Sequence, residues 1–206
     1  MRDYIKKLLN EIKFSQERAN ELKDKFGWRF VQTQKPKSGE LYNKLHIYTF
    51  RSPKYKYNVY IEEYDYEFYL ISFTPKLNKD FFVKQSILQQ KGRKFFDAYS
   101  YQTKEQIPLQ IFSLMVSEIN KILKTKQFAS FGYLGAPDVK TGDDDFDMFN
   151  TKRVRIYNQL LNDEFGNTHK IISDIRFSGS LVLNRDVLEE YPMLEKYCFD
   201  ILESHL

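Results

Sequence analysis

The spacing of apolar residues predicts helices at both ends of the chain and one long helix near its middle. Apolar residues recur at helical spacing in residues 3–12. A second helix is predicted for residues 15–26, because Ser15 suits a cap at its start and Gly27 suits its end. Residues 192–202 are predicted to form the last helix. One apolar stripe predicts the long helix over residues 108–126: Phe112, Met115, Val116, Ile119, Ile122 and Leu123.

Alternation of apolar and polar residues predicts strands between these helices. The clearest alternation lies in residues 55–73, which are interrupted by a turn near residues 63–66, so we expect a β-hairpin there. A helix that begins at Asn150 is expected after the acidic loop 138–147. Further strands are predicted at residues 28–34, 45–51, 94–101, 128–137, 170–177 and 181–183.

The order of these elements predicts the fold class. Antiparallel strands come first, and a strand–helix–strand–helix–strand series follows, which is typical of an α+β protein. We expect a mixed, mainly antiparallel sheet flanked by helices. Residues 1–27 are predicted to form an N-terminal helical segment, and residues 28–206 a single α+β domain.

Composition narrows the class of protein. Of the 206 residues, 42% are apolar, so a core can be buried. A single cysteine, Cys198, excludes a disulfide framework and a multi-cysteine metal site, and we expect no metal. No apolar run is long enough to span a bilayer, and the charged, amphipathic start of the chain is unlike a signal peptide, so we expect a cytoplasmic protein. The richness in Lys, Asn, Ile, Tyr and Phe indicates an AT-rich bacterial or phage genome.

Charge is unevenly distributed along the chain. The net charge of +4 is too small to predict a nucleic-acid partner. Residues 1–60 carry 14 Lys and Arg against 6 Asp and Glu, whereas residues 61–206 carry 18 against 22. This positive first part can either steer an anionic ligand or form an ordinary solvated helix surface.

The stretch FNTKRVRIYNQL, residues 149–160, carries the candidate chemistry. Tyr157 lies seven residues after Asn150, which is close to two helical turns, so the two share one helix face. Asn150 or Thr151 can cap this helix, and the free N–H groups of its first turn can bind an anion. Lys152 and Arg153, with Arg155, would reinforce the positive potential there.

This stretch resembles the fourth helix of the GNAT superfamily of acyl-CoA-dependent N-acyltransferases, on the pattern Asn150, Arg153, Ile156, Tyr157. The order of predicted elements is also similar over residues 28–185. The resemblance implies an enzyme that transfers an acyl group from acetyl-CoA or another acyl-CoA to an amine. It assigns cofactor binding to Asn150, with Tyr157 as the general acid that protonates the departing thiolate. In GNAT proteins the preceding strand splays from its neighbour to admit the cofactor arm, and Gly132 and Gly135 suit such a strand.

The chain departs from the GNAT pattern at the phosphate-binding loop. The family grips pyrophosphate with a glycine-containing loop at the start of the long helix. Here the corresponding residues are YQTKEQIPLQ, which have no glycine, and Pro108 lacks an N–H. A partly similar stretch, QQKGRK at residues 89–94, lies too far before the long helix to be this loop.

Each of these predicted functional roles has a purely structural alternative. Tyr157 can be a core tyrosine, and the cations near it can be a solvated helix face. The acidic cluster can be an exposed loop rather than a site for a cation: Asp143, Asp144, Asp145 and Asp147. The alternative function is a non-catalytic α+β protein, of GNAT-like or other fold, that binds a partner protein through its positive first helices or has a structural role.

Overall fold

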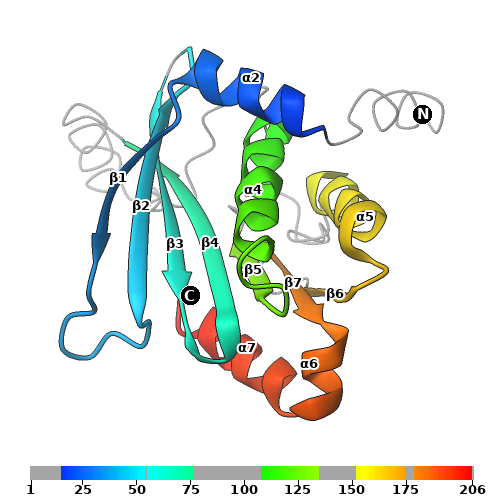
Figure 1. Cartoon of the computed structure of the whole chain (residues 1–206). Coiled ribbons are helices and arrows are strands. Elements are labelled where there is room, and N and C mark those ends of the chain that lie inside the picture. The colour runs from blue at the N-terminus through cyan, green and yellow to red at the C-terminus, as the bar shows by residue number, and fades with distance from the viewer. Residues whose placement is uncertain (1–14, 54, 77–107, 135–151, 175–178, 206) are drawn as a thin grey trace, which may run out of the picture.

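The computed structural model describes residues 15–53, 55–76, 108–134, 152–174 and 179–205. Their strands form one seven-stranded sheet in the order β1-β2-β3-β4-β5-β7-β6 (Figure 1). In chain order the strands are β1 (Arg29–Gln34), β2 (Lys44–Arg51), β3 (Lys56–Glu63), β4 (Phe68–Pro75), β5 (Ser130–Leu134), β6 (His169–Asp174) and β7 (Gly179–Asn184). The helices are α2 (Gln16–Phe26), α4 (Pro108–Leu123), α5 (Lys152–Phe165), α6 (Arg185–Glu190) and α7 (Leu194–Glu203), with the 3₁₀ turn η1 (Asp65–Glu67) between β3 and β4.

The sheet is mixed and mainly antiparallel, as the order of elements predicts. β4 and β5 run parallel, and every other neighbouring pair is antiparallel. The predicted α+β class, with helices on the sheet, is therefore confirmed. No helix among the described residues combines the length and the apolar character that crossing a membrane requires.

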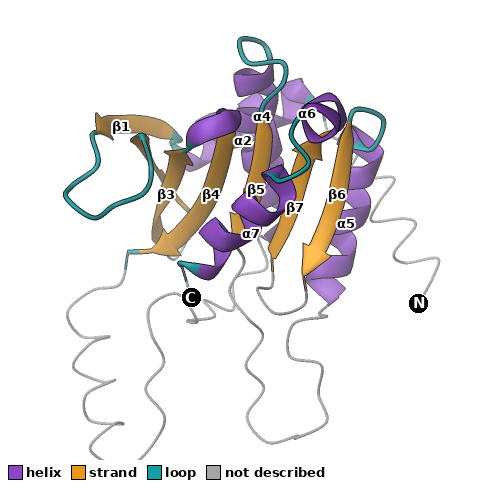
Figure 2. Ribbon diagram, turned by 90° about the horizontal axis from the view of Figure 1, so that it is seen from below, coloured by secondary structure: helices purple, strands orange, loops and turns teal. Residues whose placement is uncertain are grey.

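Two crossovers place α4 and α5 on the same face. The connection from β4 to β5 passes through α4, and the connection from β5 to β6 passes through α5. Because β7 is antiparallel to both of its neighbours, β6 runs parallel to β5. Parallel crossovers are right-handed as a rule, and two such crossovers in the same direction across a sheet put their helices on one face. Figure 2 shows this arrangement, with α7 on the opposite face.

Each face of the sheet carries its own apolar cluster because successive strand residues point to opposite sides. In β4, Tyr69 and Ile71 pack with α2, α4 and α5, whereas Phe68 and Leu70 pack with α7. In β7, Val182 faces the first cluster, and Leu181 and Leu183 face the second. The helical side of the second cluster consists of Leu194, Cys198, Ile201 and Leu202.

Gly132 in β5 is required by the packing of the second face. A Cβ atom at this position would lie 2.9 Å from Phe68 Cζ and 3.2 Å from Leu70 Cδ1. Gly132 is also paired on both sides, with Leu70 of β4 and Leu181 of β7. The close approach of side chains thus accounts for this glycine within the paired part of the strand.

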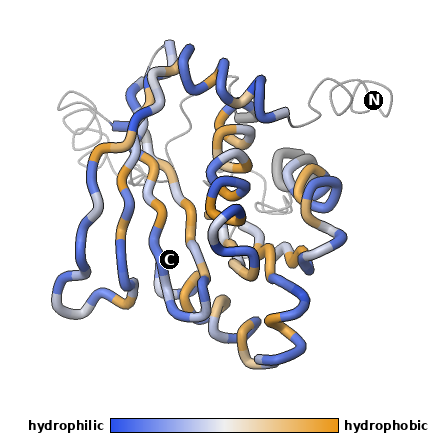
Figure 3. The backbone as a smooth tube through the Cα atoms, viewed as in Figure 1, coloured by the Kyte–Doolittle hydropathy of each residue, from blue (hydrophilic) through white to orange (hydrophobic). Residues whose placement is uncertain are grey.

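α2 shares its core with the sheet. Ser15 Oγ accepts a hydrogen bond from Arg18 N, and Gly27 ends the helix in the left-handed conformation at φ 58°, as the sequence predicts. The helix is mostly hydrophilic (Figure 3), but Ala19 and Phe26 are buried. Lys23 Nζ lies 2.7 Å from Glu118 Oε1 on α4, a carboxylate that is almost fully buried.

The predicted elements within the described residues are all present, and one element was not predicted. α6 follows β7 directly, with the Asn184 side chain accepting hydrogen bonds from Asp186 N and Val187 N at its start. The sequence predicts no helix between the last strand, residues 181–183, and residue 192. The helix predicted at residues 3–12 and the strand predicted at residues 94–101 lie outside the described residues.

Candidate active site at the ends of the parallel strands

The carboxyl ends of β4 and β5 form the candidate site. Their parallel pairing runs from Phe68↔Ser130 to Ile71↔Tyr133, while β4 itself continues to Pro75. The β5-facing edge of β4 beyond Ile71 therefore has no strand partner among the residues that the structure describes. In open α/β sheets, ligand sites lie outside the carboxyl ends of the parallel strands.

Tyr157 lies close to this edge, and two aromatic contacts fix its ring. The ring is half-buried and stacks on Phe112 of α4, with centroids 4.6 Å apart and an interplanar angle of 6°. Tyr133 of β5 meets it edge-on, at 6.1 Å and 74°. Since Tyr133 is the last β5 residue paired with β4, these contacts hold Tyr157 at the point where the parallel pairing stops.

A group of hydroxyl and amide side chains continues from Tyr133 across the same face. The Ser180 hydroxyl donates to Asn158 Oδ1 at 2.5 Å and lies 3.5 Å from the Tyr133 hydroxyl oxygen. Ser173 Oγ is 3.4 Å from Ser180 Oγ. Tyr133 and Ser173 both pair with Ser180 in the sheet, and Asn158 reaches them from α5. The result is a polar wall next to the Tyr157 ring.

Burial changes the pKa of one member of this polar wall, Tyr133. Desolvation raises the pKa of Tyr133 to about 12, against a smaller lowering by the Ser180 hydrogen bond. Tyr133 therefore keeps its proton at neutral pH and can act as a hydrogen-bond donor. A phenol with a pKa near 12 is a poorer proton donor than an ordinary tyrosine, whose pKa is about 10. Tyr133 therefore suits orientation of a ligand rather than proton transfer.

The structure places only some of the predicted site residues. Tyr157 lies at the end of the parallel pair, and Gly132 lies one residue before Tyr133, inside the paired strand. Lys152 and Arg153 are the first two residues of α5, so their backbone belongs to its first turn. Three predicted residues, Asn150, Thr151 and Gly135, and the acidic cluster of residues 143–147 lie outside the described residues.

Three residues of the site were missed from the sequence: Tyr133, Asn158 and Ser180. Tyr133 lies in a stretch that was correctly predicted as a strand, and Asn158 follows Tyr157 directly. Nothing in the local pattern indicates that β7 lies beside β5, and this pairing is what brings Ser180 to the wall. The place of Ser180 can therefore be predicted only from the order of the strands in the sheet.

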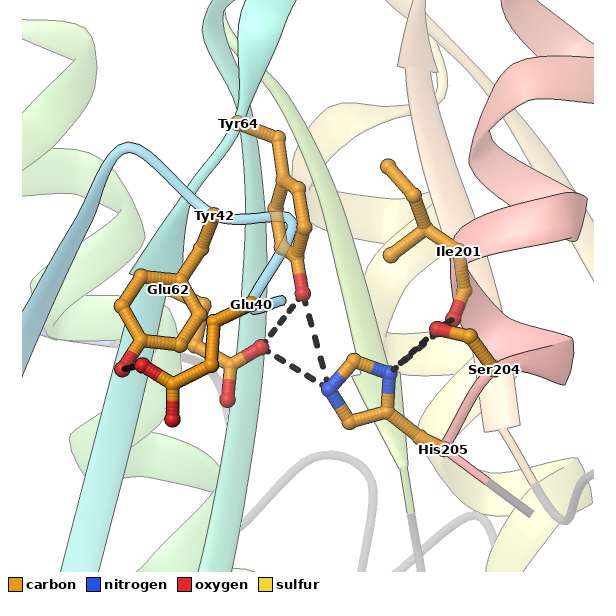
Figure 4. A network of polar contacts seen from close by, with 7 residues as sticks. All are labelled: Glu40, Tyr42, Glu62, Tyr64, Ile201, Ser204 and His205. Atoms are coloured by element: carbon orange, nitrogen blue, oxygen red, sulfur yellow. Dashed lines mark hydrogen bonds and ion pairs between the residues drawn. The ribbon is translucent and has the colours of Figure 1, made fainter. Parts of the chain in front are cut away.

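A second polar cluster joins the last helix to β3. Figure 4 shows Glu62, Tyr64 and His205 directed toward one another. Tyr64 donates to Glu62 Oε2 at 2.5 Å, and His205 Nε2 lies 2.9 Å from the same oxygen. Burial, and then this hydrogen bond, raise the pKa of Tyr64 well above its usual value. Beside them, Tyr42 donates to Glu40 Oε2 at 2.5 Å.

His205 is placed to be a cation. Its Nδ1 lies 3.0 Å from the Ile201 carbonyl oxygen, and its Nε2 faces the Glu62 carboxylate, so both ring nitrogens meet acceptors. A neutral imidazole has one N–H, and only the protonated ring can donate to both. The Glu62 hydrogen bond accordingly raises the pKa of His205, in opposition to burial. The cluster thus fastens the end of α7 to the sheet through a charged pair.

The His205 contact should make stability depend on pH with a definite sign. A raised pKa in the folded state adds stability that is fully present below the unfolded value of about 6.5 and is lost as pH rises through the folded value. We expect His205→Gln to destabilise the protein by no more than about 1 kcal/mol at pH 5.5, and by less at pH 8.5. Urea denaturation of both proteins at the two pH values measures the difference. An equal loss at both values would contradict the assignment.

The buried residues His169 and Cys198 have structural roles. His169 Nε2 lies 3.1 Å from the Ala129 carbonyl oxygen, and burial lowers the pKa of His169, which keeps the ring neutral. Cys198 lies on the buried face of α7, and burial raises the pKa of its thiol far above that of a reactive cysteine. Within the described ranges, no group of three or more His, Cys, Asp or Glu side chains is arranged to hold a metal ion.

Comparison of the chain with protein-family models, with curated proteins and with solved structures finds no match in any of the three. The function is therefore inferred from the geometry and chemistry at the ends of β4 and β5. Among the predicted site residues, Tyr157 lies there, in contact with Tyr133.

Proposed function

We propose that this protein is a divergent GNAT-like N-acyltransferase that transfers an acyl group from acetyl-CoA or another acyl-CoA to an amine. The observation that carries the proposal is the place of Tyr157. Its ring is held by Phe112 and Tyr133 where the pairing of the two parallel strands stops. A phenol at that point is where the GNAT resemblance requires the general acid.

The order of elements supports the same proposal. β1 to β4 form an antiparallel meander, and α4, β5, α5, β6 and β7 follow in that order. This is the series on which the sequence resemblance rests, and the parallel β4–β5 pair lies at its centre. The candidate acid comes from the helix that directly follows β5.

The site can accept the amide-rich arm of a coenzyme A thioester. Beyond Ile71, the edge of β4 that faces β5 offers backbone groups without a described strand partner, and such groups bind amides. The half-buried ring of Tyr157 lies beside that edge, where it packs on the buried rings of Phe112 and Tyr133. The first turn of α5 can bind phosphate through its N–H groups, next to Lys152 and Arg153.

Proton transfer by Tyr157 completes the proposed reaction. The thioester supplies a carbonyl carbon that an amine can attack directly, so the protein needs no nucleophile of its own. As the carbon–nitrogen bond forms, the carbon–sulfur bond breaks and the amine nitrogen gives one proton to water. Tyr157 gives its proton to the departing sulfur, because a phenol is protonated at neutral pH and can donate to the thiolate as it forms, and then regains a proton from water. Tyr133, which keeps its proton, helps to orient the reacting groups.

Ligand binding tests the proposal directly. We expect acetyl-CoA and CoA, each at about 100 times its dissociation constant, to stabilise the folded chain by about 2.7 kcal/mol. For a protein of this size that is a rise in Tm of roughly 5–10 °C. ADP serves as the control, because it carries the phosphate charge without the thiol-bearing arm. The absence of any shift at millimolar acetyl-CoA would refute the acyltransferase and leave the non-catalytic alternative.

A further inference from the structure

A pocket with aromatic walls lies on the opposite face of the sheet from Tyr157. It has a volume of about 450 Å³, is open to solvent on one side, and is bordered by the turn between β3 and β4, the link between α6 and α7, and α7 itself. A cavity of this size can enclose a small organic group. Its principal lining side chains are Tyr66, Glu190, Tyr191, Met193, Tyr197 and Asp200.

Three tyrosine rings form the walls. Tyr66 meets Tyr197 nearly at right angles, with ring centroids 5.3 Å apart and an interplanar angle of 77°. Tyr66 and Tyr191 are 5.6 Å apart at 49°. Tyr66 is 51% exposed and Tyr191 is 45% exposed, so ring surface remains open to a ligand. Aromatic rings that stand at steep angles to one another, with part of their surface exposed, can recognise an alkylated ammonium group through cation–π contacts.

The turn that carries Tyr66 adopts a strained backbone. Tyr66 has φ 55° and ψ 29°, and Glu67 has φ 51°, so two successive non-glycine residues lie in the left-handed region. This conformation is unfavourable for a bulky aromatic residue, and a glycine would adopt it more easily. The turn nevertheless holds a large ring against α7. Strain of this kind is concentrated at functional sites.

The charges around the rings favour a cation. Glu190 and Asp200 line the pocket, against the single cation Lys196, whose exposed side chain can extend into solvent. The Glu190 carboxylate raises the pKa of Tyr191, and burial together with the Asp65 charge raises the pKa of Tyr197. A carboxylate therefore lies close to each of these two phenols. An anionic ligand would meet these carboxylates unfavourably.

We propose that this pocket binds an alkylated ammonium group through the faces of Tyr66, Tyr191 and Tyr197 and the carboxylates of Glu190 and Asp200. A guanidinium group, which is flat, stacks on one ring, whereas a compact ammonium group carrying several methyl groups contacts rings at steep angles. The group can belong to a free small molecule or to a methylated lysine side chain. The pocket lies at the amino end of β4, and the candidate active site lies at its carboxyl end on the other face. The pocket is therefore independent of the proposed acyl transfer.

Titration of the full chain with choline tests the proposal, with 3,3-dimethyl-1-butanol as a neutral control of the same shape. We expect choline to bind with a dissociation constant of about 1 mM or below, and the control at least about fivefold more weakly. A trimethyllysine peptide forms a second arm, and its affinity relative to choline shows whether a side chain or a free molecule is the source. Equal affinity for choline and the neutral control, or no binding of either ammonium probe, would overturn the proposal.

Matched variants test whether choline binds in this pocket. Tyr66→Asn removes a ring while retaining a residue type that tolerates the left-handed conformation, and we expect it to weaken choline binding at least about fivefold. Asp200→Asn changes one exposed charge and should weaken binding in the same direction. Phe128→Ser removes an exposed aromatic residue elsewhere and should leave binding unchanged. Unchanged affinity in both Tyr66→Asn and Asp200→Asn would show that the pocket is not the site.

Discussion

Replacing Tyr157 with phenylalanine is expected to lower turnover with acetyl-CoA by about 100-fold or more, because general acid catalysis contributes on that order. The phenylalanine ring keeps the stack on Phe112 and the edge contact with Tyr133, so the fold and the binding of CoA should not change. Steady-state kinetics with an amine acceptor measures the first effect, and the thermal shift with CoA measures the second. The change should appear in kcat rather than in KM.

Two comparisons make this result specific to the Tyr157 hydroxyl. Tyr133→Phe removes the other phenol of the wall and should reduce kcat much less, because we assign Tyr133 to orientation. A thiol ester with a more acidic leaving group needs less protonation, so it should recover part of the activity of Tyr157→Phe. Undiminished turnover in Tyr157→Phe would show that another group is the acid.

Replacing Lys23 with methionine is expected to destabilise the fold by about 3 kcal/mol. Glu118 is 3% exposed, and its nearest cation is Lys23 Nζ at 2.7 Å. Removing that cation leaves a carboxylate buried without an adequate partner, since Lys121 Nζ is 3.9 Å away and largely exposed. Lys23 also donates to Ser117 Oγ at 2.8 Å, a contact that the variant loses. Chemical denaturation measures the change in the free energy of unfolding.

Removing both charges should reverse most of that loss. Buried ion pairs can often be replaced by apolar residues at little cost, so Lys23→Met with Glu118→Met should be close to the wild type. Lys121→Met serves as the control and should change stability by less than about 1 kcal/mol, because it removes an exposed cation. If the double variant is no more stable than Lys23→Met alone, the buried charge is not the cause.

The helices and strands could be predicted from the sequence because the patterns that define them lie within each element. Ser15 and Gly27 mark both ends of α2 through hydrogen bonds and a backbone conformation within a few residues. The alternation in residues 55–73 defines β3 and β4, which pair through a short turn. The apolar stripe of α4 matches the face that it buries. In each case the residues that carry the pattern are also those that make the structure.

The candidate sites depend on contacts between distant parts of the chain, and these were only partly predictable. Tyr157 was identified through a pattern within one helix, but its neighbours Phe112 and Tyr133 come from two other elements. The pocket on the opposite face combines Tyr66 with Tyr191 and Tyr197, which no spacing rule connects. The left-handed backbone conformation at Tyr66 could not be predicted either, because the sequence has no glycine there to indicate it.

The insertion of β7 between β5 and β6 has a consequence for the order of folding. During synthesis on the ribosome, β5 and β6 emerge before the strand that joins them, and among the described strands β6 pairs with β7 alone. β6 and one edge of β5 therefore stay unpaired until residue 184 has been made, while the β1–β4 meander and the β4–β5 pair can already form. Ser180 arrives with that last strand, so the polar wall beside Tyr157 is assembled at the end of the process. A nascent chain halted before β7 would expose unpaired strand edges of the kind that chaperones protect.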